Sequence, residues 1–390
     1  LLFGMEVKDT RRPEIKDLFI YNDVDTNFNN LTANKLKLTK LNDSVFNSNE
    51  ININGLTGFG INVIDKQDLA NNKNGVYKIS TYYNDQLVNS ILYDGFLFEE
   101  SILINTLIDY KYYLNNKERI IKLFRSPGNT LSFYENLNNG LINKTKGYSE
   151  FKIKISDIKN NNTYVIIPLN SENKLIQQNK KVKSKIKYNK LINNDLESNF
   201  NIENYQISIP KNTFLKNVNL LIELKNDSLK VINPTIPVFK NIKIVFPNYF
   251  NKKGNYLANR DQNNNEYFIT SKLNSKNNFE TKTKRLGTFF IKNDSVVPLI
   301  KSLSFKKGDW ISNKNEIKFK ILDKETGIKK YRGSINGKWV LFEYEYKKDE
   351  ISYSFDQYYI KKSRNEVEIY VEDMVGNINV LKTSFYRKAN

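Results

Sequence analysis

The chain has 390 residues, with 61 Lys and Arg against 42 Asp and Glu, which gives a formal net charge of +19; it contains no His and no Cys. These two absences exclude a Ser-His-Asp triad, an imidazole general base, a thiol nucleophile, disulfides, and zinc sites built from His or thiolate. Aromatic residues make up 13%, too many for a disordered chain, and the length predicts about two or three domains.

Strands are predicted from near the start of the chain. Pro13 suits the first residue of a strand, because it fixes φ and lacks an N–H, and alternating apolar side chains follow it. Asn84-Asp85 predicts a hairpin turn, since both residue types tolerate positive φ. Further strands are predicted over 61–66, 150–157 and 164–169.

A different unit is predicted over 170–290. It opens with a polar linker and a lysine-rich strand, Lys181–Tyr188, and its other strands are short, alternating and separated by Pro and Asn. These strands are predicted within Tyr205–Phe214, Val218–Leu224, Ile242–Phe246 and Leu286–Phe290.

An internal repeat relates the two ends of the chain. The first pair of matched segments shares the pattern D-[ST]-x-x-P-x-I-K-x-L, and the third pair places Asn161 opposite Asn377. The pairs, in the same order along both copies, are 9–18 with 294–303, 61–66 with 319–324, and 150–157 with 366–373.

We therefore predict an all-β chain of three tandem β-sandwiches, the first and third being Ig-like copies of one module. The predicted domains are 1–169, 170–290 and 291–390. The first carries an insertion at about 98–149, in which the apolar spacing over 99–115 predicts a short helix.

Several strings resemble those of a known family. Leu1-Leu2-Phe3-Gly4, followed by Asp9 and Pro13, resembles the stretch just after the catalytic domain of long LytM/lysostaphin-type zinc murein endopeptidases of Bacteroidetes. The resemblance covers nearly the whole chain through the order and spacing of its strings. The further strings are Ile207–Phe214, Leu286–Phe289, Asn336–Val340 and Asp373–Asn377.

The chain also departs from that family. Its enzymes bind zinc through His and Asp, and this sequence has no His, so no catalytic, cofactor-binding or zinc residue is carried over. The resemblance implies that the catalytic domain lies upstream of Leu1, and that this chain is a non-catalytic accessory region in the periplasm or cell envelope. No apolar run approaches the ~20 residues that span a bilayer, and no signal-peptide pattern is visible.

The strongest local charge feature is a run of lysines without a nearby acid. On a strand, alternate lysines share one face, which suits contact with peptidoglycan carboxylates, lipid head groups or nucleic acid. The more ordinary role is a solvated face whose edge lysines discourage strand aggregation. The candidate residues are Lys180, Lys181, Lys183, Lys185, Lys187 and Lys190.

Aromatic side chains cluster in the last predicted domain. Trp339, Tyr344 and Tyr346 form a candidate platform for sugar rings, with packing between the two sheets as the more ordinary role. Two acid pairs, Glu99-Glu100 and Glu343/Glu345, are candidates for glycosidase chemistry. The spacing of Glu343 and Glu345, about 7 Å along one strand face, does not exclude it, but their alternation with Tyr344 and Tyr346 favours a solvated strand face.

Four aspartates recur at predicted strand ends, where Ig-like modules sometimes hold Ca²⁺. No EF-hand-type loop surrounds Asp65, Asp157, Asp323 or Asp373, so we predict an Asx-turn role and no metal site in this chain.

From this resemblance we expect the chain to be a non-enzymatic accessory region of a cell-wall metalloendopeptidase, serving positioning, wall attachment or binding of an envelope protein. The first alternative is an independent cell-surface or adhesion protein built of Ig-like modules. Nucleic-acid binding is a weaker alternative, because the charge is spread along the chain, is mostly Lys, and accompanies no recognition motif.

Overall fold

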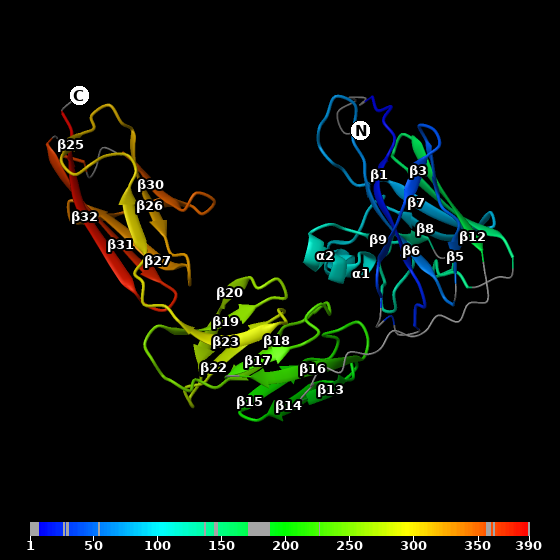
Figure 1. The fold of residues 1–390 in the computed structure, drawn as a ribbon. Coiled ribbons are helices and arrows are strands. Elements are labelled where there is room, and N and C mark those ends of the chain that lie inside the picture. The colour runs from blue at the N-terminus through cyan, green and yellow to red at the C-terminus, as the bar shows by residue number, and fades with distance from the viewer. Residues whose placement is uncertain are drawn as a thin grey trace.

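A computed structural model describes residues 8–25, 28, 31–53, 55–135, 138–143, 147–170, 188–225, 227–355, 360–361 and 363–388. Within these ranges the chain forms three pairs of sheets, each enclosing its own hydrophobic core. We name them the first Ig-like module (β1–β12), the middle module (β13–β23) and the second Ig-like module (β24–β32) (Figure 1). The predicted all-β class is confirmed.

The first Ig-like module packs a four-stranded sheet, in the order β2-β1-β6-β9, against a larger one, in the order β10-β8-β7-β11-β12-β4-β3, with β5 beside β12. Apolar side chains that alternate along the strands fill the space between them, as on β11. The strands are β1 (Glu14–Tyr21), β2 (Asn34–Leu36), β3 (Leu38–Lys40), β4 (Val45–Ser48), β5 (Ile51–Asn52), β6 (Gly58–Ile64), β7 (Lys78–Tyr83), β8 (Gln86–Leu92), β9 (Ile121–Lys122), β10 (Tyr134–Glu135), β11 (Ser149–Ser156) and β12 (Asn162–Asn170).

The predicted helix in the insertion is present, but it is broken into short pieces. A 3-10 helix, η1 (Phe98–Leu103), leads into α1 (Ile104–Leu107), and α2 (Tyr110–Asn116) follows. Ile108 is extended, and the Asp109 carboxylate accepts a hydrogen bond from Tyr112 N, which caps the start of α2. The apolar spacing therefore predicted helical residues correctly. It did not reveal that the Asp109 cap begins a new helix and so divides the predicted one.

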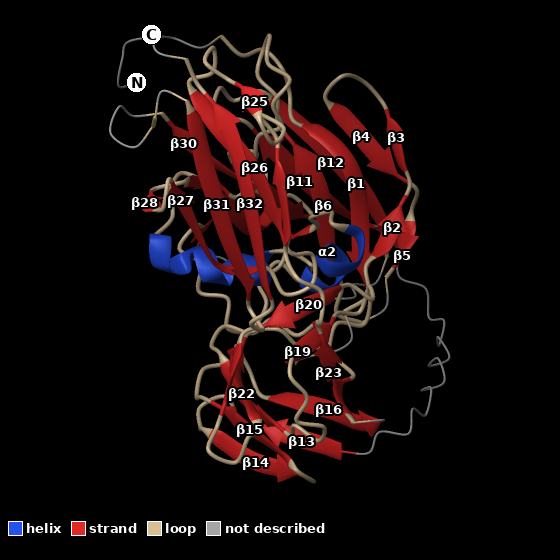
Figure 2. Ribbon diagram, turned by 90° about the vertical axis from the view of Figure 1, so that its left-hand side faces the viewer, coloured by secondary structure: helices blue, strands red, loops and turns tan. Residues whose placement is uncertain are grey.

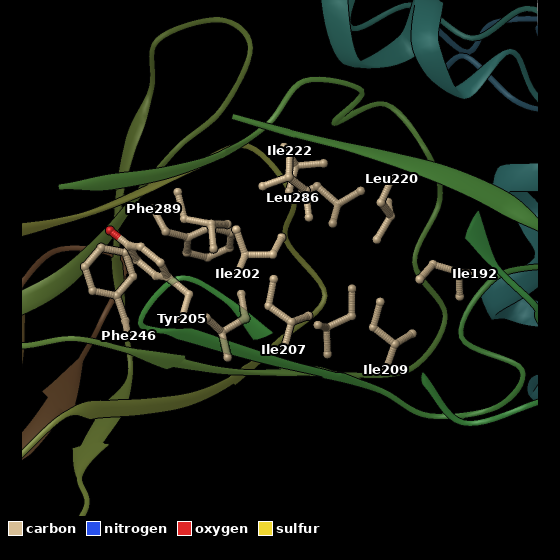
Figure 3. Close-up of a cluster of buried hydrophobic side chains, with 14 of the residues drawn as sticks. Ile192, Ile202, Tyr205, Ile207, Ile209, Leu220, Ile222, Phe246, Leu286 and Phe289 are labelled. Atoms are coloured by element: carbon tan, nitrogen blue, oxygen red, sulfur yellow. The ribbon is translucent and has the colours of Figure 1, made fainter. Parts of the chain in front are cut away.

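The middle module packs a six-stranded sheet, in the order β13-β16-β17-β23-β19-β20, on a five-stranded one, in the order β14-β15-β18-β22-β21. Its core is rich in Ile and Phe (Figure 3). The strands are β13 (Tyr188–Ile192), β14 (Ser198–Ile202), β15 (Tyr205–Ile209), β16 (Val218–Lys225), β17 (Ser228–Val231), β18 (Ile242–Phe246), β19 (Asn255–Arg260), β20 (Glu266–Ile269), β21 (Ser271–Leu273), β22 (Phe279–Thr283) and β23 (Thr288–Asn293).

The second Ig-like module is smaller and has four- and five-stranded sheets, in the orders β24-β26-β30-β29 and β25-β32-β31-β27-β28. Its core is lined by alternating residues of β26 and β31. The strands are β24 (Leu299–Ser302), β25 (Asp309–Trp310), β26 (Glu316–Leu322), β27 (Ile328–Ile335), β28 (Lys338–Val340), β29 (Glu343–Glu345), β30 (Glu350–Ser354), β31 (Arg364–Asp373) and β32 (Ile378–Tyr386).

The two Ig-like modules share one topology, which confirms the predicted repeat. In each, the first strand pairs antiparallel with a later strand of the same sheet (β1 with β6, β24 with β26). A short strand early in the module pairs in parallel with its last strand (β4 with β12, β25 with β32). Equivalent side chains hold the entering proline: Thr163 Oγ1 donates to Pro13 O at 2.8 Å, and Asn379 Nδ2 donates to Pro298 O at 2.8 Å.

Both Ig-like modules lie on the same side of the middle module in two perpendicular views (Figures 1 and 2). Within each of them, the chain enters beside the end of β6 or β26 and leaves along the last strand toward the opposite end. In the second Ig-like module this entry end adjoins the middle module, because β23 ends at Asn293 and β24 begins at Leu299.

Candidate functional site

Three segments meet at the entry end of each Ig-like module, and each brings an aspartate. In the first module Asp9 precedes β1, Asp65 follows β6 and Asp157 follows β11. One carboxylate oxygen from each residue lies within 4.8 Å of the other two. We call this cluster the first acid triad.

The second Ig-like module repeats the arrangement. Asp294 precedes β24, Asp323 follows β26 and Asp373 ends β31, and one carboxylate oxygen from each again lies within 4.8 Å of the others. This second acid triad occupies the positions that the internal repeat matches to the first.

Most of these aspartates organise turns, as the sequence predicted. Asp157 Oδ1 accepts hydrogen bonds from Lys159 N at 2.9 Å and Asn161 N at 2.8 Å. Asn161 Nδ2 donates to Asp157 Oδ2 at 2.7 Å and to Asp9 O at 3.1 Å. The Asx-turn role is therefore confirmed at Asp157, and the same turn joins β11 and β12 to the segment that enters the module.

The second triad has equivalent contacts. Asp373 Oδ1 accepts from Val375 N at 3.0 Å and Asn377 N at 2.8 Å, and Asn377 Nδ2 donates to Asp294 O at 3.1 Å. Asp323 Oδ1 accepts from the backbone N–H groups at positions 325, 326 and 327, at 3.1, 2.7 and 2.8 Å. The Asx-turn role is confirmed here too.

Asp65 differs from these residues. Its side chain is buried, with 7% of the residue exposed, and its Oδ1 atom has no hydrogen-bond partner. Burial, the Asp157 carboxylate and, more weakly, the Asp9 carboxylate raise the pKa of Asp65. An Asx-turn role does not explain a buried oxygen that accepts nothing, because such an atom has lost its water without compensation.

The second triad is electrostatically similar. Burial raises the pKa of Asp294, and the neighbouring carboxylates of Asp323 and Asp373 act in the same direction. Asp294 Oδ2 accepts a hydrogen bond from Thr326 Oγ1 at 3.0 Å. Across the part of the chain that the structure describes, none of the six triad aspartates forms an ion pair with Lys or Arg.

The lysine run is only partly within the structure. Lys180, Lys181, Lys183, Lys185 and Lys187 lie outside the described residues. Lys190 lies on β13, and its Nζ atom is 5.6 Å from the centre of the Phe200 ring. The anionic-polymer contact at these lysines stays a prediction.

The aromatic candidates are exposed. Trp339, Tyr344 and Tyr346 have exposed fractions of 55%, 40% and 69%, so packing between the two sheets is not their role. Trp339 lies on β28, however, and Tyr344 on β29, which belong to different sheets. Tyr344 instead neighbours Tyr331, with ring centres 5.8 Å apart.

A stacked aromatic pair, in which Trp310 is exposed and Tyr386 half-buried, was missed in the sequence. Trp310 on β25 stacks on Tyr386 on β32, with ring centres 5.2 Å apart and planes at 30°, and Trp310 is 58% exposed. The two residues are 76 positions apart in sequence, and the parallel pairing of the two strands brings them together. No local pattern signals this pair, because the two residues meet only through strands that are far apart in sequence.

The candidate catalytic carboxylates are surface groups. Glu343 and Glu345 are exposed on β29, and Glu345 Oε1 accepts from Lys347 N at 3.1 Å. Glu100 accepts from Ser132 N and Ser132 Oγ, both at 2.7 Å, which orders the insertion. The zinc ligands of the murein endopeptidases also find no counterpart, since the chain has no His.

A cleft of about 1460 Å³ lies where the insertion faces the middle module. Its lining includes Lys122, Asp109 and Lys216. Lys122 is buried, its Nζ donates to Ser126 Oγ at 2.5 Å, and burial lowers its pKa to about 8. Sequence patterns did not single out Lys122, because its burial depends on contacts across the insertion.

No protein-family model and no curated protein matches the chain. Among solved structures, the fibronectin(III)-like modules of Clostridium thermocellum CbhA are 8% identical, with 87% of this chain and 88% of that chain covered and a TM-score of 0.20. Bacteroides ovatus SGBP-B, solved with a mixed-linkage heptasaccharide, is 10% identical, with 98% and 71% covered and a TM-score of 0.17. Both TM-scores are low, and we draw no functional inference from these structures.

No helix in the described ranges is long and apolar enough to cross a membrane.

Proposed function

We propose that this chain is a non-catalytic region of the bacterial cell envelope or surface, whose tandem β-sandwich modules position or attach a partner. The observation that carries the proposal is that each module closes its own core. A series of such modules forms a spacer whose outer faces are free to bind, while stability comes from the interior.

The junctions between modules support a positioning role. Between the middle and second Ig-like modules, Tyr256 OH donates to Glu325 Oε1 at 2.8 Å, and Lys292 Nζ lies 2.7 Å from the same oxygen. Between the first and middle modules, Asn263 Nδ2 donates to Leu114 O at 2.8 Å. These polar contacts link the surfaces of neighbouring modules and so favour a preferred mutual orientation.

The more specific role that we propose is an accessory region of a zinc-dependent cell-wall endopeptidase, located in the periplasm or envelope. Its support is the order and spacing of the strings from Leu1–Gly4 to Asp373–Asn377. The zinc would belong to an upstream catalytic domain. An independent surface or adhesion protein is the competing role, and the sequence that precedes Leu1 in the intact gene distinguishes the two.

Wall attachment is tested with purified peptidoglycan sacculi and the full chain. We expect the chain to sediment with sacculi at low salt. Release in about 0.5 M salt would show that binding is electrostatic, since exposed charges are screened there. Retention in salt that is lost in Trp310→Ala would identify the aromatic pair instead. Tyr249→Ala is the matched control, since Tyr249 is an exposed aromatic of the middle module. No sedimentation at any salt concentration would remove wall attachment.

A further inference from the structure

The two acid triads lie at equivalent positions of the two Ig-like modules. The sequences of these modules resemble each other only in the three short matched segments of the repeat. Each brings three carboxylates within 4.8 Å, and two members of each triad are buried. Like charges at this distance in a partly desolvated site repel strongly, and the cost is greatest without a compensating cation. Both entry ends keep three carboxylates together despite this repulsion, so one function common to both sites should explain them.

Turn formation alone does not supply that reason. In the middle module Asn274 Oδ1 accepts from Lys276 N and Asn278 N, both at 3.0 Å, and so makes the same kind of turn without a charge. Asp261 does so with a single carboxylate, accepting from Asn263 N and Asn265 N at 2.8 and 2.9 Å. A neutral residue would therefore hold the turns at Asp157 and Asp373, and the clustered negative charge is additional.

The unpaired oxygen of Asp65 points to what the charge is for. It is a buried acceptor with no donor, in a residue whose carboxylate lies against two others. A cation bound by all three carboxylates would give Asp65 Oδ1 a partner. It would also neutralise the repulsion among the three negative charges.

We propose that each acid triad binds one Ca²⁺ ion, through the carboxylates of Asp9, Asp65 and Asp157 in the first Ig-like module and of Asp294, Asp323 and Asp373 in the second. All-oxygen ligands favour a hard cation, and neither site offers a nitrogen or sulfur ligand to zinc or copper. Ca²⁺ takes six to eight oxygens in flexible geometry, so water completes the coordination of three carboxylates.

The second site has a mechanical consequence that goes beyond the proposed function. Asp294 lies in the connection between β23 of the middle module and β24 of the next, and its N–H bonds to Gly254 O at 2.9 Å. Asp323 lies in the turn that carries Glu325, the residue that contacts Tyr256 and Lys292. An ion shared by Asp294 and Asp323 therefore fastens the connection to the module and fixes the orientation of the junction.

The experiment uses the full chain, freed of metal by chelation and titrated with CaCl₂ by isothermal calorimetry. We expect two Ca²⁺ per chain and an increase in the thermal midpoint, because a ligand that binds only the folded state stabilises it. MgCl₂ is titrated in parallel and is expected to bind more weakly, since Mg²⁺ demands octahedral geometry and gives up water reluctantly. A stoichiometry below two, or tighter binding of Mg²⁺, would overturn the assignment.

Single-site variants locate the ions. Asp65→Asn and Asp323→Asn keep the shape of the side chain and remove one ligand charge, and each is expected to weaken one of the two sites by about 10- to 100-fold or more. Asp261→Asn is the matched control, because it changes the same residue type in the same kind of turn outside the triads. Retention of both ions at full affinity in the two triad variants would refute the proposal.

If Asp65→Asn does not fold, as judged by circular dichroism, Asp9→Asn replaces it, since Asp9 is the more exposed member of the first triad. Interdomain effects are read separately by small-angle scattering. Ca²⁺ is expected to narrow the distribution of distances between modules in wild type and in Asp65→Asn but not in Asp323→Asn. Failure of sacculus binding would leave this result intact, so the two proposals fail independently.

Discussion

The side-chain amide of Asn377 donates a hydrogen bond to the backbone carbonyl of Asp294, 3.1 Å away, and so joins the last hairpin of the second Ig-like module to the segment that enters it. Asn161 makes the same contact with Asp9 O, also at 3.1 Å. These contacts close each module by connecting residues 83 and 152 positions apart in sequence. Each amide therefore holds together a first and a last segment that no strand pairing joins at that point.

Asn377→Ala tests this closure. The substitution removes the donor to two partly buried acceptors, Asp294 O and Asp373 Oδ2, and to the exposed Val296 O, so we expect a loss of about 1 kcal/mol in the free energy of unfolding. Urea unfolding followed by tryptophan fluorescence measures it, since both Trp residues lie in this module. Lys382→Ala is the control, because it removes an exposed ion pair with Glu368 in the same module; equal losses in the two variants would contradict the closing role.

Lys122→Met is expected to change how stability depends on pH. The folded-state pKa of Lys122 is about 8, below its value of 10.5 in the unfolded chain, so the folded chain binds fewer protons between these values. Stability contributed by this residue therefore rises as pH increases from about 8 toward 10.5, and burial of the charge is most costly below pH 8. The variant is expected to be more stable than wild type at pH 7 by up to about 3 kcal/mol.

The measurement is the difference in the free energy of unfolding between Lys122→Met and wild type at several pH values, which cancels the titration of other groups. We expect this difference to shrink between pH 8 and pH 10. Lys330→Met is the control, because the hydrogen bond of this exposed lysine with Glu372 raises its pKa, and it is expected to show no such change between pH 8 and pH 10. A difference that is constant with pH would contradict the assignment of a lowered pKa to Lys122.

Gly333→Ala is expected to strain the core of the second Ig-like module. A Cβ at Gly333 would overlap the ring of Phe342, which is buried against Phe319 and Tyr353, so the ring must move. Overpacking of this kind costs about 1–3 kcal/mol. Thermal unfolding of Gly333→Ala, Phe342→Leu and the double variant gives a double-mutant cycle. We expect the double variant to lose less stability than the two single variants lose in sum, because the smaller Leu side chain makes room for the new Cβ. Strict additivity would show that the ring is not the obstacle.

Glu325→Ala is expected to loosen the junction between the middle and second Ig-like modules without weakening either. The contacts with Tyr256 and Lys292 are partly exposed, and such pairs contribute at most about 1 kcal/mol. Small-angle scattering should show a broader distribution of distances between modules, with the thermal midpoint nearly unchanged. Glu280→Ala removes a pair with Lys243 inside the middle module and should leave the distribution unaltered.

The fold was largely predictable because the repeat carries its landmarks in local sequence. Pro13 and Pro298 mark the starts of the first strands, and positive φ at Asn84 and Asn336 matches the hairpin turns that those residues predicted. Alternation of apolar residues over 150–157 and 366–373 likewise specified strands with one buried face. Such signals depend on neighbours within a few residues, which one sequence displays directly.

The sites were less predictable because they depend on segments far apart in sequence. Asp9, Asp65 and Asp157 were recognised singly, as repeat landmarks or turn residues, but their convergence at one end of the module requires the sheet order. The exposure of Trp339 and Tyr344 likewise follows from short edge strands, whereas aromatic residues on strands are usually packed. Aligning the two copies shows that these acids recur, but it does not show that three of them meet in each module.

The matched entry ends bear on how such a chain could be lengthened. Each Ig-like module carries, within its own sequence, the asparagine that binds the segment leading into it. A copy inserted by duplication would bring this closing contact with it, and the module before it would add only contacts such as that of Gly254 O with Asp294 N. Gene duplication could therefore add or remove copies, as in other tandem proteins stabilised by neighbouring units, while each junction kept the same construction.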